Sequence, residues 1–308
     1  MFRASGSSVR GLIFVLLAAF FWGISGTAAQ FLFSHQIEVM QVVQTRSSFA
    51  FVLFAASILL FRRESLRVTP PRLGLLALAG IIGIGFSNYT YYATISVSTV
   101  STAIILQYTA PVLVMVYGIL TRTESAGLTK WLALSISLSG CLLAVGTGGA
   151  DLFSAGPAAI AIGTASAFCF AFMSIIGRRL NADPTSDLWG NLVYTIGFAA
   201  LFWAVFQPPW QWSDWNLDTT AWLMLIGFSL ISVLLPYLFF YLGLTFLPPT
   251  TVLIISTAEP VTAMISSWLI LGESMSAFQI TGASLVLLAI LILGLDYRRR
   301  PPSQASQT

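Results

Sequence analysis

The chain has 308 residues, of which 57% are hydrophobic and only 8% are charged, and its mean hydropathy is +0.87. Soluble domains carry about 25% charged residues, so this composition excludes an ordinary soluble fold. A net charge of +3 could suggest a nucleic-acid partner, but the placement of the basic residues explains it better. We therefore expect a protein of the lipid bilayer that binds no nucleic acid.

Apolar segments of about 20 residues recur along the chain, and each is long enough to cross a bilayer as a helix. The sequence thus predicts an all-α polytopic membrane protein with ten transmembrane helices. These helices are expected at residues 10–33, 40–61, 73–94, 99–120, 129–147, 155–177, 189–207, 221–243, 249–271 and 277–296. The first segment exceeds the apolar core of about 7 to 15 residues found in signal peptides, so we interpret it as a retained helix.

The basic residues indicate how these helices are oriented. All but one of the 14 lysines and arginines fall on one side of the ten-helix arrangement. They are Arg3, Arg10, Arg62, Arg63, Arg67, Arg72, Arg122, Lys130, Arg178, Arg179, Arg298, Arg299 and Arg300. By the positive-inside rule, both termini are predicted to be cytoplasmic. The longest loop of the other side, residues 207–215, is rich in tryptophan and is typical of an interfacial anchor.

An internal repeat divides the chain into two halves. A shift of 149 positions aligns residues 110–111, Ala-Pro, with residues 259–260, Glu-Pro. We therefore expect two five-helix repeats, at residues 10–147 and 155–297. Because five is an odd number, the second repeat must enter the membrane inverted. Inverted repeats are typical of transporters that bind their substrate near the membrane midplane.

Two predicted helices carry small residues at four-residue spacing, which lets helix backbones approach closely. In the first helix these residues are Ala19, Gly23 and Thr27, and in the sixth they are Ala159, Gly163, Ala167 and Ala171. The glycine-rich stretch at residues 80–85 follows no predicted strand, so it does not indicate a nucleotide-binding loop.

Glu259 is the strongest candidate functional residue, because it lies midway along the apolar run at residues 249–271. A charge at the bilayer centre costs about 2.5–3.5 kcal/mol on insertion scales and marks a functional site by default. A carboxyl group that is neutral when dehydrated and ionised when hydrated would couple proton entry to substrate exit. The alternatives are a protonated carboxyl bonded within the bundle or a structural pair with Arg46. Arg46 itself could instead snorkel toward the interface.

Further candidates lie at a similar depth. Gln107 lies about 12 Å from the start of its predicted helix, at 1.5 Å per residue, which places it near the middle of the membrane. Pro111 and Pro260 are expected to kink their helices and to free the carbonyls of Gln107 and Ser256. The other substrate or coupling candidates are Asn88, Trp22, Tyr89, Tyr92, Tyr108, Tyr237 and Tyr241. For each aromatic residue the alternative is packing against the core or lipid, and for each amide it is a hydrogen bond between helices.

Four short stretches resemble the EamA family of the drug/metabolite transporter superfamily. They are residues 22–26 (WGISG), 106–111 (LQYTAP), 258–260 (AEP) and 271–273 (LGE), and the resemblance extends from residue 10 to about 297. The sequence departs from the family pattern at Thr123, where a glycine usually precedes the acidic residue. The resemblance implies a secondary exporter of amino acids or related small metabolites in the bacterial inner membrane. It also implies alternating access around a central cavity formed by both halves.

Other classes of function find less support in the sequence. Motifs typical of metal, dithiol or nucleotide sites do not occur, and Cys141 and Cys169 lie inside apolar segments, so we expect no metal, no cofactor and no enzyme activity. The alternative is an integral-membrane enzyme acting on a lipid, which would need convergent acidic or histidine residues at an interfacial loop. A sensory or scaffold role would need a soluble domain. Substrate, direction, coupling ion and oligomeric state stay open.

Overall fold

The computed structural model describes residues 3–35, 37–125, 127–145, 155–183, 185–272 and 274–299, and all regular structure in these ranges is helical. The end of the predicted fifth segment, at 146–147, lies outside the described residues, as do Glu273 and Arg300.

The helices of the first half follow the predicted apolar runs. They are α1 (Arg3–Ser34), α2 (Val39–Phe61), α3 (Pro70–Leu78), α4 (Ser87–Val97), α5 (Val100–Gln107), α6 (Ala110–Leu120) and α7 (Leu128–Ala144). A short 3-10 turn, η1 (Arg63–Leu66), follows α2, and a π-helical segment, η2 (Ala79–Phe86), joins α3 to α4 without a break.

The second half repeats this order. Its helices are α9 (Pro157–Ala182), α10 (Leu188–Phe206), α11 (Thr219–Ser229), α12 (Leu235–Phe246), α13 (Pro249–Ser256), α14 (Glu259–Leu271) and α15 (Ala277–Arg299). The tryptophan-rich loop forms a 3-10 segment, η3 (Pro209–Trp215), and a second π-helical segment, η4 (Leu230–Leu234), joins α11 to α12.

In the described part of the chain, nine helical stretches are long and apolar enough to cross a membrane, and α7 is a shorter apolar helix of 17 residues. Each π-helical segment joins two helices into one stretch, and α5 with α6 and α13 with α14 count together in the same way. The structure thus confirms an all-helical polytopic fold, whereas the tenth span remains a prediction.

The two halves match element by element at the shift of 149 positions. Moving α5 by that shift gives the bounds of α13, residues 249–256, and both π-helical segments fall at corresponding places. The two breaks come from Pro111 and Pro260, because proline has no N–H to continue the helix. Each expected kink is in fact a complete break, with a turn between two half-helices.

The glycine-rich stretch is a packing surface. Gly80 and Gly83 lie in η2, where an added Cβ would be 2.4 Å from the Thr195 carbonyl oxygen and 2.7 Å from Met173 Cβ. Only glycine therefore lets this segment approach α9 and α10 so closely.

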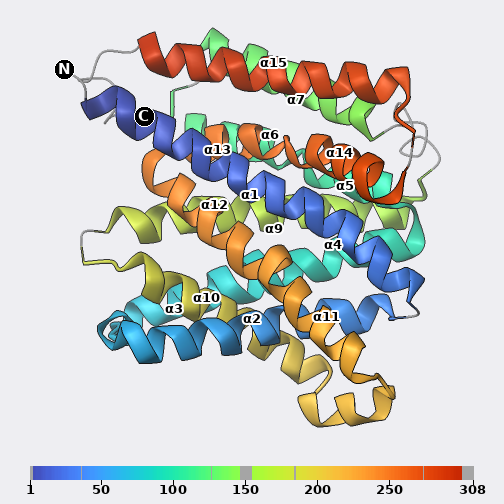
Figure 1. Ribbon diagram of the computed structural model, residues 1–308. Helices are drawn as coiled ribbons and strands as arrows, with labels where there is room; N and C mark the ends of the chain where they lie inside the picture. The colour runs from blue at the N-terminus through green and yellow to red at the C-terminus, as the bar shows by residue number, and fades with distance from the viewer. Residues whose placement is uncertain are drawn as a thin grey trace.

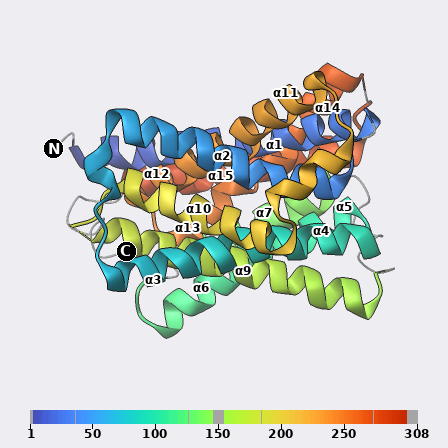
Figure 2. The same cartoon turned by 90° about the horizontal axis from the view of Figure 1, so that it is seen from below.

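Figure 1 shows the helices as one bundle, with α7 and α15 side by side along one edge and α1 crossing the bundle obliquely. The start of α1 and the end of α15 lie at the same end of the bundle, which is on the left both in Figure 1 and in Figure 2, where the molecule is seen from below. The loops joining α2 to α3 and α9 to α10 meet there, since Arg72 donates to the Thr185 carbonyl at 3.1 Å and Arg62 stacks on Trp189. We call this the basic end.

The predicted small-residue stripe of α1 packs directly on α14. Thr262 Oγ1 donates to the Ala19 carbonyl at 3.0 Å, and the Thr27 and Ser266 hydroxyls are 2.6 Å apart. Between these contacts Gly23 touches the α14 backbone. This interface holds α1 against the half-helix that begins with Glu259.

Gly23→Ala should therefore destabilise the fold, because its Cβ would lie 1.9 Å from Thr262 Oγ1 and 2.7 Å from the Ala263 nitrogen. Overpacking costs about 1–3 kcal/mol, and contact with backbone places this case at or above the upper value. The measurement is thermal unfolding of the purified protein in detergent. Gly26→Ala is the matched control, since a Cβ there meets nothing within 4 Å. Equal melting temperatures for the two variants would contradict this account of the α1–α14 interface.

Candidate functional site

A cavity of about 100 Å³ lies in the middle of the bundle and is lined by helices of both halves. Seven of the predicted site residues line it: Trp22, Arg46, Asn88, Tyr92, Gln107, Tyr237 and Glu259. The remaining lining residues are Ser25, Gly26, Ala29, Ser87, Tyr91 and Phe170. The structure therefore brings together side chains from six helices that the sequence placed only by depth.

Glu259 begins α14, directly after the break that Pro260 causes. The hydroxyl of Tyr108, which lies in the corresponding break of the first half, donates to Glu259 Oε2 at 2.7 Å. The same hydroxyl is 3.0 Å from the Ser256 carbonyl, the acceptor that Pro260 leaves without a helical partner. The Tyr108 hydroxyl thus lies within hydrogen-bonding distance of both the carboxyl group and the freed carbonyl, has one proton to donate to either of them, and ties the two breaks together.

Arg46 projects from α2 and is 7% exposed, so it does not snorkel to the interface. Its guanidinium donates to the Tyr92 hydroxyl at 2.9 Å and to Asn88 Oδ1 at 3.0 Å. Among the described residues, no carboxylate lies within 4 Å of it, and its buried Nε makes no hydrogen bond to the protein. The structural ion pair with Glu259 considered from the sequence is absent from this arrangement.

The cavity therefore holds two separated ionisable groups of opposite sign. Arg46 belongs to the first half and Glu259 to the second, and the two groups are close enough to interact electrostatically. Each is held by neutral partners, Tyr92 and Asn88 on one side and Tyr108 on the other. Such an arrangement can bind a small solute that carries both a positive and a negative group.

Aromatic rings from α1, α9 and α12 form part of the cavity wall. Trp22 contacts Tyr237 edge-on with the ring centroids 5.4 Å apart, and it also packs on Phe170 and Phe240. Because α1 begins at the basic end, Trp22 lies closer to that end than Ala29, which also lines the cavity.

Gln107 illustrates the structural alternative for a buried amide. Its Nε2 donates to Ser166 Oγ at 2.9 Å, and that hydroxyl lies 3.3 Å from the Ser87 carbonyl. The amide thereby links α5, α9 and α4 while its side chain still lines the cavity. A hydrogen bond between helices and a place in the site are compatible here.

Two of the predicted aromatic residues lie away from the cavity. Tyr89 is 40% exposed and stacks between Phe86 and Phe206 on the outside of the bundle. Tyr241 is fully buried in the core beside Phe240.

Sequence reasoning missed Tyr91, which lines the cavity in place of Tyr89. Helical spacing could have found it, because positions three and four after Asn88 share its face and position one does not. Ser25 and Gly26 were also missed, although they belong to the WGISG stretch that carries part of the family resemblance.

Polar contacts hold the two halves together at the basic end. The loop residue Glu124 accepts from Lys130 Nζ at 3.2 Å and from the Thr250 backbone N–H at 3.3 Å, so it caps α13. Arg179 of α9 donates to the Tyr117 hydroxyl of α6. Lys130 and Glu124 are both buried, with side chains 1% and 7% exposed.

A protein-family model, the EamA-like transporter family, matches the chain twice, at residues 9–146 and 157–295. The chain belongs to the EamA-like transporter family. Both matches together cover nearly the whole described bundle, in agreement with the two halves seen in the structure. The protein is therefore a multi-pass membrane protein of a transporter family, and the resemblance noted in the sequence is confirmed.

Individual relatives of this EamA-like protein carry transporter names. It is 27% identical over 301 residues to the uncharacterized inner membrane transporter YicL of Salmonella typhimurium, covering 96% of this chain and 98% of the relative. It is 24% identical over 233 residues to the threonine/homoserine exporter RhtA of Escherichia coli strain K12, covering 71% and 70%. A protein crystal structure at 16% identity matches with a TM-score of 0.75, covering 94% of this chain and 98% of that one, which supports the fold.

Glu124→Ala should destabilise this EamA-like protein strongly, because it leaves Lys130 buried without its partner and α13 without its cap. Removing one member of a buried pair costs about 3–5 kcal/mol. Thermal unfolding in detergent measures the loss. Asp183→Ala is the control and should shift the melting temperature much less, since the Asp183 side chain is 46% exposed and lies 3.9 Å from Arg72. A melting temperature of Glu124→Ala close to that of wild type would contradict a contribution of the buried pair.

Proposed function

We propose that the protein is a secondary exporter of small amino acids in the bacterial inner membrane, with both termini cytoplasmic and ten spans in two inverted five-helix repeats at residues 10–147 and 155–297. The observation that carries the proposal is the single cavity in which Arg46 and Glu259 face a common space without pairing with each other. A zwitterionic amino acid would supply a carboxylate to pair with Arg46 and an ammonium group to pair with Glu259.

The substrate carboxylate is assigned to Arg46. A guanidinium offers a planar set of donors that matches a carboxylate, and Tyr92 and Asn88 already hold its orientation. Because the Arg46 side chain is already ordered, binding of the substrate loses less side-chain conformational entropy. Tyr92 and Asn88 take one N–H from each terminal nitrogen, so the second N–H of each nitrogen remains for the substrate.

The substrate ammonium is assigned to Glu259 on the opposite helix. An ionised carboxylate at the start of α14 is favoured by the dipole of that half-helix. The cavity volume of about 100 Å³ is well below the 300–1,000 Å³ of pockets for drug-sized ligands, so a small solute fits best. The name of the relative RhtA, a threonine/homoserine exporter, agrees with this substrate class.

The paired helix breaks and the contacts at the basic end support alternating access. Ala29, Arg46 and Tyr92 lie on the parts of α1, α2 and α4 away from the basic end, whereas the Glu124 contacts close the opposite side. We assign this arrangement to the outward-facing state. Opening toward the cytoplasm would then separate Glu124 from α13 while the half-helices pivot at their breaks.

If the site binds both the carboxylate and the ammonium group of its substrate, analogues that lack one of these groups should compete poorly with labelled threonine for uptake into proteoliposomes. Threonine amide lacks the carboxylate and N-acetylthreonine lacks the ammonium, so each should compete at least about tenfold more weakly than threonine, since a bond to a charged group contributes about 1.5–3 kcal/mol. In Arg46→Gln, threonine should compete no better than its amide. The control is Arg62→Gln, because Arg62 stacks on Trp189 at the basic end. Equal competition by threonine and its amide in the wild-type protein would refute the proposal.

Proton coupling is assigned to Glu259. Its carboxyl group can bind a proton in one half of the transport cycle and the substrate ammonium group in the other half. Glu259→Gln should abolish transport driven by a pH gradient while the protein is still made in normal amounts. Uptake into proteoliposomes with and without the gradient measures the effect. Glu64→Gln is the control, since Glu64 is exposed in the turn after α2. Full gradient-driven uptake by Glu259→Gln would remove Glu259 from the coupling step.

A further inference from the structure

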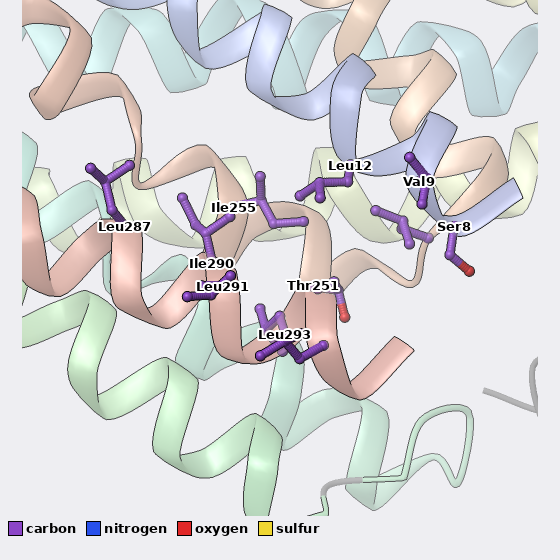
Figure 3. A pocket seen from close by; sticks show the side chains of 12 residues that line it. Ser8, Val9, Leu12, Thr251, Ile255, Leu287, Ile290, Leu291 and Leu293 are labelled. Carbon is purple, nitrogen blue, oxygen red and sulfur yellow. The ribbon is translucent and has the colours of Figure 1, made fainter. Parts of the chain in front are cut away.

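A second cavity, of about 290 Å³, lies between α1, α13 and α15 and is separate from the central site. Its lining residues are Ser8, Val9, Leu12, Leu247, Thr251, Ile255, Leu287, Ile290, Leu291, Leu293, Gly294 and Leu295. Figure 3 shows the side chains of Leu12, Ile255 and Ile290 converging on the space from three different helices. The lining contains no charged residue, unlike that of the central cavity.

The position of this groove relative to the bilayer points to its occupant. From Leu287 to Leu295 the α15 wall rises about 12 Å at 1.5 Å per residue, close to the depth of one leaflet in a core of about 30 Å. Because α15 ends at the basic end, the groove lies in the leaflet on that side. Along its rim Leu287, Leu291 and Leu295 are 55%, 57% and 43% exposed, so they face the hydrocarbon.

We infer that the groove binds one acyl chain of a phospholipid from the leaflet at the basic end. An apolar space that opens onto hydrocarbon is filled at least cost by a lipid chain, and the basic residues at this end attract anionic headgroups. The acyl chain would run along α15 and pack against Leu12 and Ile255. It would thereby brace α13, the half-helix whose last carbonyl receives the Tyr108 hydroxyl.

Gly294 supplies a direct way to fill the groove. A Cβ at this position would meet only Leu12 Cδ2, at 3.8 Å, so a larger side chain can be placed without a backbone clash. Gly74 of α3 is the matched control, because it is also a helical glycine near the basic end and a Cβ there meets nothing within 4 Å. Gly294→Leu and Gly74→Leu therefore add the same group inside and outside the groove.

The test is native mass spectrometry of the purified, delipidated protein titrated with phosphatidylglycerol. The wild-type protein and Gly74→Leu should each retain one lipid per chain, and Gly294→Leu should lose it or bind at least tenfold more weakly. A phosphatidylglycerol with a photoactivatable acyl chain provides a second measurement on the wild-type protein alone. It should label α1 around Val9 and Leu12 together with α15 around Leu291. Unchanged lipid retention by Gly294→Leu, or labelling spread evenly over the exposed helices, would overturn the inference.

Discussion

The hydrogen bonds of the Tyr108 hydroxyl are the contact on which the site depends. In hydrocarbon every exposed backbone acceptor must find a partner within the protein, so a helix broken by Pro260 is tolerated only if the freed Ser256 carbonyl is satisfied. The Tyr108 hydroxyl contacts this carbonyl and the Glu259 carboxyl group, and its single proton serves the carbonyl when a protonated Glu259 donates to the hydroxyl oxygen. Because Tyr108 lies in the break of the first half, its hydroxyl links the two breaks.

Pseudo-symmetry arranges the backbone, but the chemistry belongs to single positions. The counterpart of Glu259 at the shift of 149 positions is Ala110, and the counterpart of Lys130 is Gln279. Hence the carboxyl group of the cavity comes from the second half alone, while the buried lysine that neutralises Glu124 belongs to the first. Both halves share the helix breaks and the π-helical segments. The two halves differ in which of them carries each charged side chain.

Much of this architecture could be predicted from the sequence, because the bilayer imposes apolar runs of a set length and proline marks the breaks. The shift of 149 positions anticipated the match of α5 with α13. The cost of burying a charge singled out Glu259, and Arg46 stood out as the one basic residue outside the one-sided charge pattern. Tyr89 was named from its depth alone, without helical phase, whereas Tyr91 is the residue that lines the cavity. The bonds of Tyr108 to Glu259 and of Arg46 to Asn88 join residues distant in sequence, and only the packing of several helices fixes them.

The central claim is that a zwitterion joins the two separated charges. It is tested most directly by an experimental structure of the protein with threonine bound. The account predicts the threonine carboxylate within hydrogen-bonding distance of the Arg46 guanidinium and its ammonium beside the Glu259 carboxylate, with Tyr92 and Asn88 still holding Arg46. Threonine bound outside this cavity, or a direct ion pair between Arg46 and Glu259 in the occupied protein, would contradict it.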